Sequence, residues 1–214
     1  MNGLDSSSAC TQSALTCLQS GGYKFIGRYY SRTTQIQGKK LTQSEAQLIS
    51  LANIAIVAVY EDGPTSYSYF SSDRGAADAQ GAIQQANAVG QPSESAIYFT
   101  VDYDATSSDI AGNITSYFQA IAATIGNQFR VGVYGSGAVC HAIKSLGCAS
   151  LAWLAQSTGW DGYSSFTDWA IKQGPEQTIC GLNADSDVAQ GEFGSFVVVA
   201  SLPFASRRTH QAST

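Results

Sequence analysis

The chain has 214 residues, 44% of them hydrophobic, which is enough for one substantial core, and we expect a single domain over residues 1–205. Only 13% of the residues are charged, and 11 basic against 16 acidic residues give a net charge of -5, which argues against a nucleic-acid partner. No segment approaches the ~20 apolar residues of a membrane span, and the N-terminus lacks the charged and apolar regions of a signal peptide.

Apolar runs separated by polar turns predict eight strands with helices between them. The expected strands cover residues 2–5, 24–30, 53–60, 95–104, 129–134, 150–156, 168–173 and 183–188. The expected helices cover residues 9–20, 42–51, 73–89, 107–125 and 137–146. Residues 157–167 leave room for one short helix, and residues 174–182 for none. A capping-box pattern, Thr42 followed three residues later by Glu45, marks the start of the second helix.

Strands that alternate with helices are typical of a parallel sheet, because a parallel connection needs a crossover segment. Eight such units close into a (β/α)8 TIM barrel with abbreviated last helices, and an open doubly wound sheet is the alternative. Residues 206–214 are predicted to form a disordered tail. The basic pairs Lys39-Lys40 and Arg207-Arg208 are interpreted as solvated loop and tail residues.

The five cysteines form no CxxC pair and show no metal-ligand spacing. Cys10 and Cys17 lie seven residues apart on an expected helix, roughly 10 Å along its axis, which is too far for a disulfide. Cys140 and Cys148 could reach each other or Cys180. Two readings remain open, one with free buried thiols alone and one with a single structural disulfide.

Carboxylates follow four of the predicted strands, at the ends that form the active-site face of a barrel. They are Asp5, Glu61 with Asp62, Asp102 with Asp104, and Asp185 with Asp187. Because side chains alternate along a strand, Asp102 and Asp104 are expected on one side, and Ile97, Phe99, Val101 and Tyr103 on the side that faces the helices. One Asp after a strand can be a helix cap or a turn residue, but agreement among four strand ends favours an active site.

The other polar residues near these strand ends suit a hydroxyl-rich ligand. Tyr134, Gln156 and Gln173 offer neutral hydrogen bonds and stacking faces, and Arg28 is the expected counter-charge for a carboxylate. Trp153, Trp160 and Trp169 are interpreted as core or rim aromatics. With only His141 and His210 in the chain, a Ser-His-Asp triad or a histidine zinc site is not expected. No cofactor is predicted, and a carboxylate Mg or Ca site is the alternative.

Several of these segments, taken in order, resemble the bacterial glycoside-hydrolase-like barrels of domain-of-unknown-function family 1906, which is related to the family-25 lysozymes. The segments are Gly3-Leu-Asp5, Phe25-Ile-Gly-Arg-Tyr29, Val59-Tyr-Glu61, Ile97-Tyr-Phe-Thr-Val-Asp102-Tyr-Asp104, Ala152-Trp-Leu-Ala-Gln156 with Gly159-Trp160, and Asp185-Ser-Asp187 with Phe193-Gly194. The resemblance implies a barrel that acts on peptidoglycan glycan strands.

The family-25 enzymes carry an Asp-x-Glu pair after the fourth strand, with the Glu as general acid, and further Asp residues after the first and last strands. In this chain Asp102-Tyr103-Asp104 takes that place, with Asp where the Glu would be. An Asp is one methylene shorter, and a displacement of about 1 Å can cost roughly 100-fold in rate. Glu61 on the neighbouring strand could supply the missing reach.

The resulting hypothesis is a muramidase-type glycosidase in which Glu61 or Asp104 protonates the glycosidic oxygen and Asp102 stabilises the charge at the anomeric carbon. Asp5 and Asp187 would set the local charge or orient the substrate. The alternatives are a sugar-binding barrel without turnover and a metal-dependent hydrolase. We expect a secreted or cell-envelope monomer with a polysaccharide substrate and neither a nucleic-acid nor a membrane partner.

Overall fold

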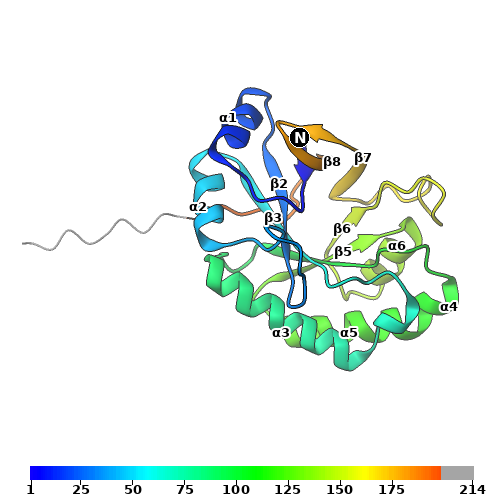
Figure 1. Cartoon of the computed structure of the whole chain (residues 1–214). Helices are drawn as coiled ribbons and strands as arrows, with labels where there is room; N and C mark the ends of the chain where they lie inside the picture. Colours follow the sequence, from blue (N-terminus) through cyan, green and yellow to red (C-terminus); the bar gives the residue numbers. More distant parts are fainter. Residues whose placement is uncertain (199–214) are drawn as a thin grey trace, which may run out of the picture.

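The computed structural model describes residues 1–198, so the predicted disordered tail over residues 206–214 lies outside the described residues. Eight strands close into one barrel in sequence order, which confirms the predicted fold class (Figure 1). The strands are β1 (Asn2–Asp5), β2 (Phe25–Tyr30), β3 (Ala55–Tyr60), β4 (Ala96–Thr100), β5 (Arg130–Gly135), β6 (Leu151–Leu154), β7 (Ile171–Ile179) and β8 (Leu182–Ala189).

Helices follow the first five strands and pack on the outside of the barrel. They are α1 (Gln12–Ser20), α2 (Gln43–Leu51), η1 (Tyr67–Tyr69), α3 (Ser72–Val89), α4 (Ser107–Asp109), η2 (Ile110–Ile114), α5 (Thr115–Ile125) and α6 (Gly137–Ser145). The long helices α3 and α5 lie side by side (Figure 1). Thr42 caps α2 as predicted, because its hydroxyl accepts the Glu45 N–H at 3.2 Å. The Glu45 side chain, however, turns away from the cap to pair with Arg28.

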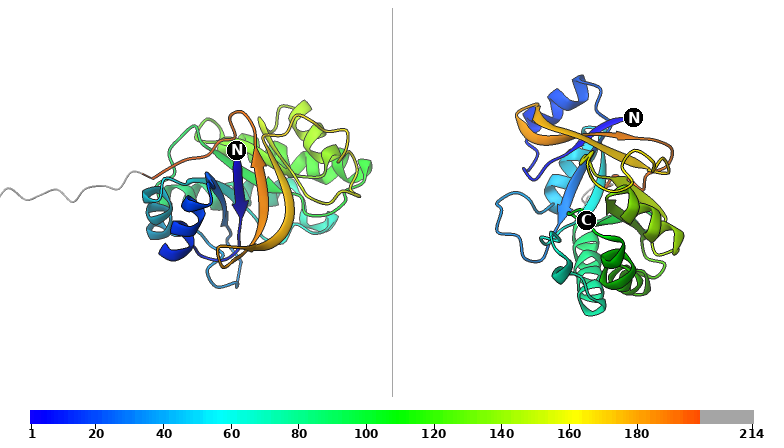
Figure 2. Two further views of the ribbon diagram at one scale, coloured as in Figure 1. Left: turned by 90° about the horizontal axis from the view of Figure 1, so that it is seen from above. Right: turned by 90° about the vertical axis from the view of Figure 1, so that its right-hand side faces the viewer.

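The direction of the last strand differs from the all-parallel prediction. Strand β8 runs antiparallel to both β7 and β1, and it forms a hairpin with β7 that lies beside β1 (Figure 2). The two turn residues Cys180 and Gly181 both have positive φ, 53° and 81°, as a tight hairpin turn requires. A parallel connection needs about a dozen residues or more, and the chain returns here after two. Residues 157–167, where one short helix was expected, form turns instead.

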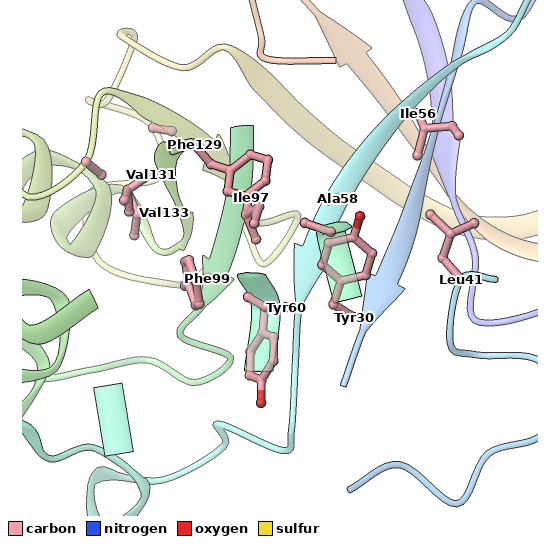
Figure 3. Packing of buried hydrophobic residues seen from close by; sticks show 14 of the residues in the cluster. Tyr30, Leu41, Ile56, Ala58, Tyr60, Ile97, Phe99, Phe129, Val131 and Val133 are labelled. Atoms are coloured by element: carbon pink, nitrogen blue, oxygen red, sulfur yellow. The ribbon is translucent and has the colours of Figure 1, made fainter. Parts of the chain in front are cut away.

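Alternating side chains divide the core into a layer between the barrel and its helices and a layer inside the barrel. As predicted, Ile97, Phe99 and Val101 face the helices, where they share a buried cluster with Phe118 and Ile121 of α5. Figure 3 shows Ile97 and Phe99 close to Val131 and Val133 of the next strand. The interior layer is built from residues of the opposite parity: Phe25, Val57, Val59, Ala96, Tyr98, Leu151, Trp153 and Ile171. The barrel is therefore filled, and its open space lies at one end.

One disulfide joins α1 to the β7–β8 hairpin, between Cys17 and Cys180 with 5.7 Å between their Cα atoms. Of the two readings left open by the sequence, the one with a single disulfide is confirmed. The pairings suggested among Cys140, Cys148 and Cys180 are not formed, because α1 lies against the hairpin and presents Cys17 to its turn. Cys10, Cys140 and Cys148 are buried free thiols.

Candidate active site

A pocket of about 220 Å³ opens at the end of the barrel where the parallel strands terminate. Four carboxylates line it, Asp5, Glu61, Asp102 and Asp185. Asp5 is the last residue of β1, Glu61 follows β3 directly, and Asp102 lies two residues beyond β4. Asp185 reaches the same end because β8 is antiparallel, which places Asp185 opposite Asp5 in the register. The reversed strand thus contributes to the site from its N-terminal half.

Asp5 is held at the base of the pocket by two hydrogen bonds. The Tyr29 hydroxyl donates to Oδ1 at 2.6 Å, and the Gln173 amide donates to Oδ2 at 2.9 Å. Gly27 allows this arrangement, since a Cβ at that position would lie 2.7 Å from both Asp5 and Trp153. Burial raises the pKa of Asp5, and the two hydrogen bonds lower it in part.

Asp187 lies beneath Asp5 and does not line the pocket. It is 2% exposed, and the Trp153 indole donates to its Oδ1 at 3.1 Å. Among the described residues, its Oδ2 has no donor, and its neighbour is the carboxyl group of Asp5. Burial, followed by the negative charge of Asp5, raises the pKa of Asp187 well above the ordinary value. The shift favours the neutral carboxyl group of Asp187, which in that form can donate to Asp5.

Three of the predicted substrate-binding residues form one connected group above Asp5. The Tyr134 hydroxyl donates to the Gln173 amide oxygen at 2.8 Å, which aims the Gln173 nitrogen at Asp5 and at Asp185, 3.3 Å away. Gln156 donates to the other oxygen of Asp185 at 3.4 Å. Burial and repulsion from Asp5, Glu176 and Asp102 raise the pKa of Asp185 to about 7.

Glu61 and Asp102 face the pocket from neighbouring strand ends, but their surroundings differ. Glu61 forms an ion pair with Lys39 at 2.9 Å, and the same ammonium group lies 4.7 Å from the centre of the Tyr29 ring. Asp102 stays open to solvent, and within residues 1–198 no hydrogen bond or ion pair is found for its side chain. Partial burial and the charge of Glu61 raise the pKa of Asp102, with Lys39 opposing.

Arg28 does not occupy the place expected for it. The predicted counter-charge in the pocket is fully buried on the outer side of β2, where it pairs with Glu45 at 2.8 Å. Strand alternation explains the difference, because β2 turns Tyr29 inward and Arg28 outward. The cation beside the pocket is instead Lys39. It was interpreted from the sequence as a solvated loop residue, but its exposed fraction is only 8%.

Asp104 also lies apart from the residues that line the pocket. Its side chain is exposed and accepts the backbone N–H of Asp161 at 3.0 Å. Strand β4 ends at Thr100, so the alternation that would place Asp102 and Asp104 on one side no longer applies. Through this hydrogen bond Asp104 instead stabilises the turn that places Trp160 at the pocket rim.

The sequence analysis missed Lys39, and it named Asp185 among the strand-end acids and Trp160 among the core or rim aromatics without giving either a role in the reaction. Asp185 carried a usable signal, because it alternates with Asp187 on a predicted strand. Lys39 carried no such signal, since its position depends on how the loop over residues 31–42 folds back over the barrel. Trp160 and Trp153 both line the pocket, whereas Trp169 packs against the outer core.

Across residues 1–198, no group of three or more His, Cys, Asp or Glu is arranged to hold a metal ion. In the same part of the chain, no helix combines the length and apolar character needed to cross a membrane.

Comparisons with known proteins agree on the fold. The sequence model of the "Rv2525c-like, glycoside hydrolase-like domain" family matches residues 16–197. The uncharacterised Bacillus subtilis protein YbfG is 32% identical over 191 residues, which are 82% of this chain and 26% of that protein, so the chain spans about a quarter of this relative.

Two solved structures show the same architecture. The Tat-secreted protein Rv2525c of Mycobacterium tuberculosis, solved with L-tartrate, has a TM-score of 0.79 at 22% identity, covering 91% of this chain and 98% of that one. The modular autolysin LytC of Streptococcus pneumoniae, solved with a synthetic peptidoglycan ligand, has a TM-score of 0.56 at 10% identity, covering 88% of this chain and 46% of that one. At these identities the likeness concerns the fold.

Proposed function

The chain belongs to the Rv2525c-like, glycoside hydrolase-like family, and from that premise we propose that it is a muramidase-type glycosidase that cleaves the glycan strands of bacterial peptidoglycan. The observation that carries the proposal is the convergence of Asp5, Glu61, Asp102 and Asp185 on one pocket at the active-site end of the barrel.

Glycoside hydrolysis needs one carboxyl group that gives up a proton and one carboxylate that meets the positive charge at the anomeric carbon. Crowded acids supply both forms, because burial and mutual repulsion raise the pKa of Asp102 and Asp185. The aromatic faces of Tyr29 and Trp160 suit the apolar faces of sugar rings, and the Gln156 amide suits their hydroxyl groups.

Peptidoglycan is proposed as the substrate by analogy with LytC, whose likeness to this chain concerns the fold. The Cys17–Cys180 disulfide supports an oxidising compartment outside the cytoplasm, where peptidoglycan is found. The relative Rv2525c is Tat-secreted, which agrees with this location.

The test measures the release of reducing ends from purified peptidoglycan. The wild type should release them, and Glu61→Gln and Asp102→Asn should each lower the rate by about 10²–10⁴-fold. Asp73→Asn is the matched control, because it makes the same change at an exposed acid in the first turn of α3. Unchanged melting temperatures would show that the variants are folded.

Two outcomes of this assay would favour the alternatives. Binding of the wild type to peptidoglycan without release of reducing ends would indicate a sugar-binding barrel. Activity that disappears with a strong chelator and returns with a divalent cation would indicate a metal-dependent hydrolase.

A further inference from the structure

Among residues 1–198, Lys39 is the only basic residue that forms an ion pair with a carboxylate lining the pocket, and that carboxylate is Glu61. Its ammonium group lies 2.9 Å from Glu61 Oε1 and above the ring of Tyr29. An ammonium group removed from water needs a partner of opposite charge, and Glu61 is that partner. The ion pair fixes the position of the Glu61 carboxylate at the edge of the pocket.

The loop that carries Lys39 is fastened to the barrel on both sides of its tip. Near Lys39, Arg28 donates to the Gly38 carbonyl at 2.6 Å, while Glu45 holds the Arg28 guanidinium through two hydrogen bonds of 2.8 and 3.2 Å. At the start of the loop, Asp62 accepts the backbone N–H groups of residues 32 and 33 at 3.1 Å each. The loop is therefore attached at both ends, and the end that carries Lys39 is attached through the buried ion pair of Arg28 with Glu45.

Asp102 has no comparable support. The part of the chain that the structure describes contains no donor to its side chain, and Glu61, the neighbouring acid, already has its cation. Two nearby carboxylates that both ionise repel each other, so the one without a cation retains its proton more readily. Partial burial acts in the same direction on the pKa of Asp102.

We propose, resting on the proposed glycosidase function, that Lys39 is a positioning residue that holds the Glu61 carboxylate toward the anomeric carbon, and that Asp102, which has no cation beside it, is the acid that transfers the proton. The roles are then the reverse of the sequence-based expectation for these two acids, and Asp104 has neither role.

The reaction balances with water as the second reactant. The Asp102 carboxyl group transfers its proton to the glycosidic oxygen as the bond from that oxygen to the anomeric carbon breaks. The Glu61 carboxylate faces the positive charge that develops on this carbon. Water then adds its oxygen to the anomeric carbon and returns a proton to Asp102, which restores the enzyme.

The test compares two substrates that differ in how much the leaving group needs a proton. One is the glycan strand, and the other is an N-acetylated disaccharide bearing a 2,4-dinitrophenolate leaving group, which departs without protonation. On the glycan, Asp102→Asn should lower kcat by at least 10²-fold, and on the dinitrophenyl glycoside by less than 10-fold. Glu61→Gln should lower kcat by at least 10²-fold on both substrates.

Lys39 is tested in the same assay, since it acts through Glu61. Lys39→Met should lower kcat on both substrates by about 10-fold or more with little change in KM, and Lys39→Arg should recover most of the rate because it restores the cation. Lys40→Met, at the exposed neighbouring lysine, is the control and should match the wild type. A merely structural role for Lys39 would lower the melting temperature of Lys39→Met without this split between kcat and KM.

The outcomes for the wild type and for the variants are distinguishable. A wild type inactive on both substrates would reject the glycosidase. An active wild type in which Glu61→Gln, and not Asp102→Asn, keeps its activity on the dinitrophenyl glycoside would reverse the two roles and overturn the inference alone. Unchanged kcat in Lys39→Met would likewise show that Lys39 does not act on Glu61 during the reaction.

Discussion

Asp185 lies between acidic neighbours, and its titration should be visible in the stability of the protein. Its pKa is raised from 3.8 to about 7, so between these values the folded state binds more protons than the unfolded state. The stabilising contribution of the neutral carboxyl group is complete below about pH 3.8 and is lost as the pH rises through 7.

Asp185→Asn removes this titration and should therefore raise the melting temperature more at pH 8 than at pH 5. We expect the two shifts in melting temperature to differ by roughly 2–4 °C, which corresponds to a difference of about 1 kcal/mol in the free energy of unfolding for a chain of this size. Thermal unfolding at the two pH values checks the prediction, with Asp73→Asn as the control at an exposed site. Equal shifts at both pH values would contradict the raised pKa.

For single residues, the sequence predicted the carboxylates of the pocket but not the side chains that contact them. Asp5 and Glu61 could be recognised because each ends an apolar strand. The faces of β2 could not be assigned from the sequence, since Ile26 and Tyr30 on one side are as apolar as Phe25 and Tyr29 on the other. For that reason Arg28 was expected in the pocket, where Tyr29 lies.

Among the elements, the β7–β8 hairpin depends on its attachment to α1. Cys17 and Cys180 are 163 residues apart in the sequence, so their bond closes nearly the whole barrel. Replacing both by Ser should lower the free energy of unfolding by about 2–5 kcal/mol, because the unfolded chain is no longer constrained. Urea unfolding of the oxidised wild type and the double variant measures this difference. Identical midpoints would show that the disulfide contributes no stability.

The turn over residues 157–165 should affect substrate binding more than catalysis. Asp104 accepts the N–H of Asp161, next to Trp160 at the pocket rim. Asp104→Ala should raise KM by a few-fold with little change in kcat, because the acids themselves stay in place. Asp104→Asn retains an accepting oxygen and should stay close to the wild type. A large drop in kcat in either variant, comparable with that expected for Glu61→Gln, would instead assign Asp104 a direct role in the chemistry.

The sequence predicted the order of the elements better than their directions. The crossovers through α1 to α6 are long enough to impose parallel strands, and those strands were expected correctly. The segment over residues 174–182 was recognised as too short for a helix, but its continuation as a hairpin was not predicted. The polar residues there, Glu176 and Gln177, are exposed and hide the strand pattern.

In the molecule as a whole, the antiparallel strand β8 closes the barrel and still contributes an acid, Asp185, to the pocket. The N-terminal amine donates to the Ala189 carbonyl at 2.8 Å, and Asp5 meets Asp185 in the register, so the first and last strands lock together. Closure places Asp5, Asp185 and Asp187 in one group beside Glu61 and Asp102. The pairing of β1 with β8 thus both closes the barrel and brings Asp185 to the pocket.

The pocket is proposed to cleave glycan strands as a muramidase, and the identity of the sugar at the newly formed reducing ends tests this most directly. Purified peptidoglycan is digested, the products are reduced with borohydride and hydrolysed, and the resulting sugar alcohols are identified by mass spectrometry. We expect muramitol in the wild-type digest and none above background with Glu61→Gln. Glucosaminitol in its place, or no new sugar alcohol with either protein, would contradict the proposed function.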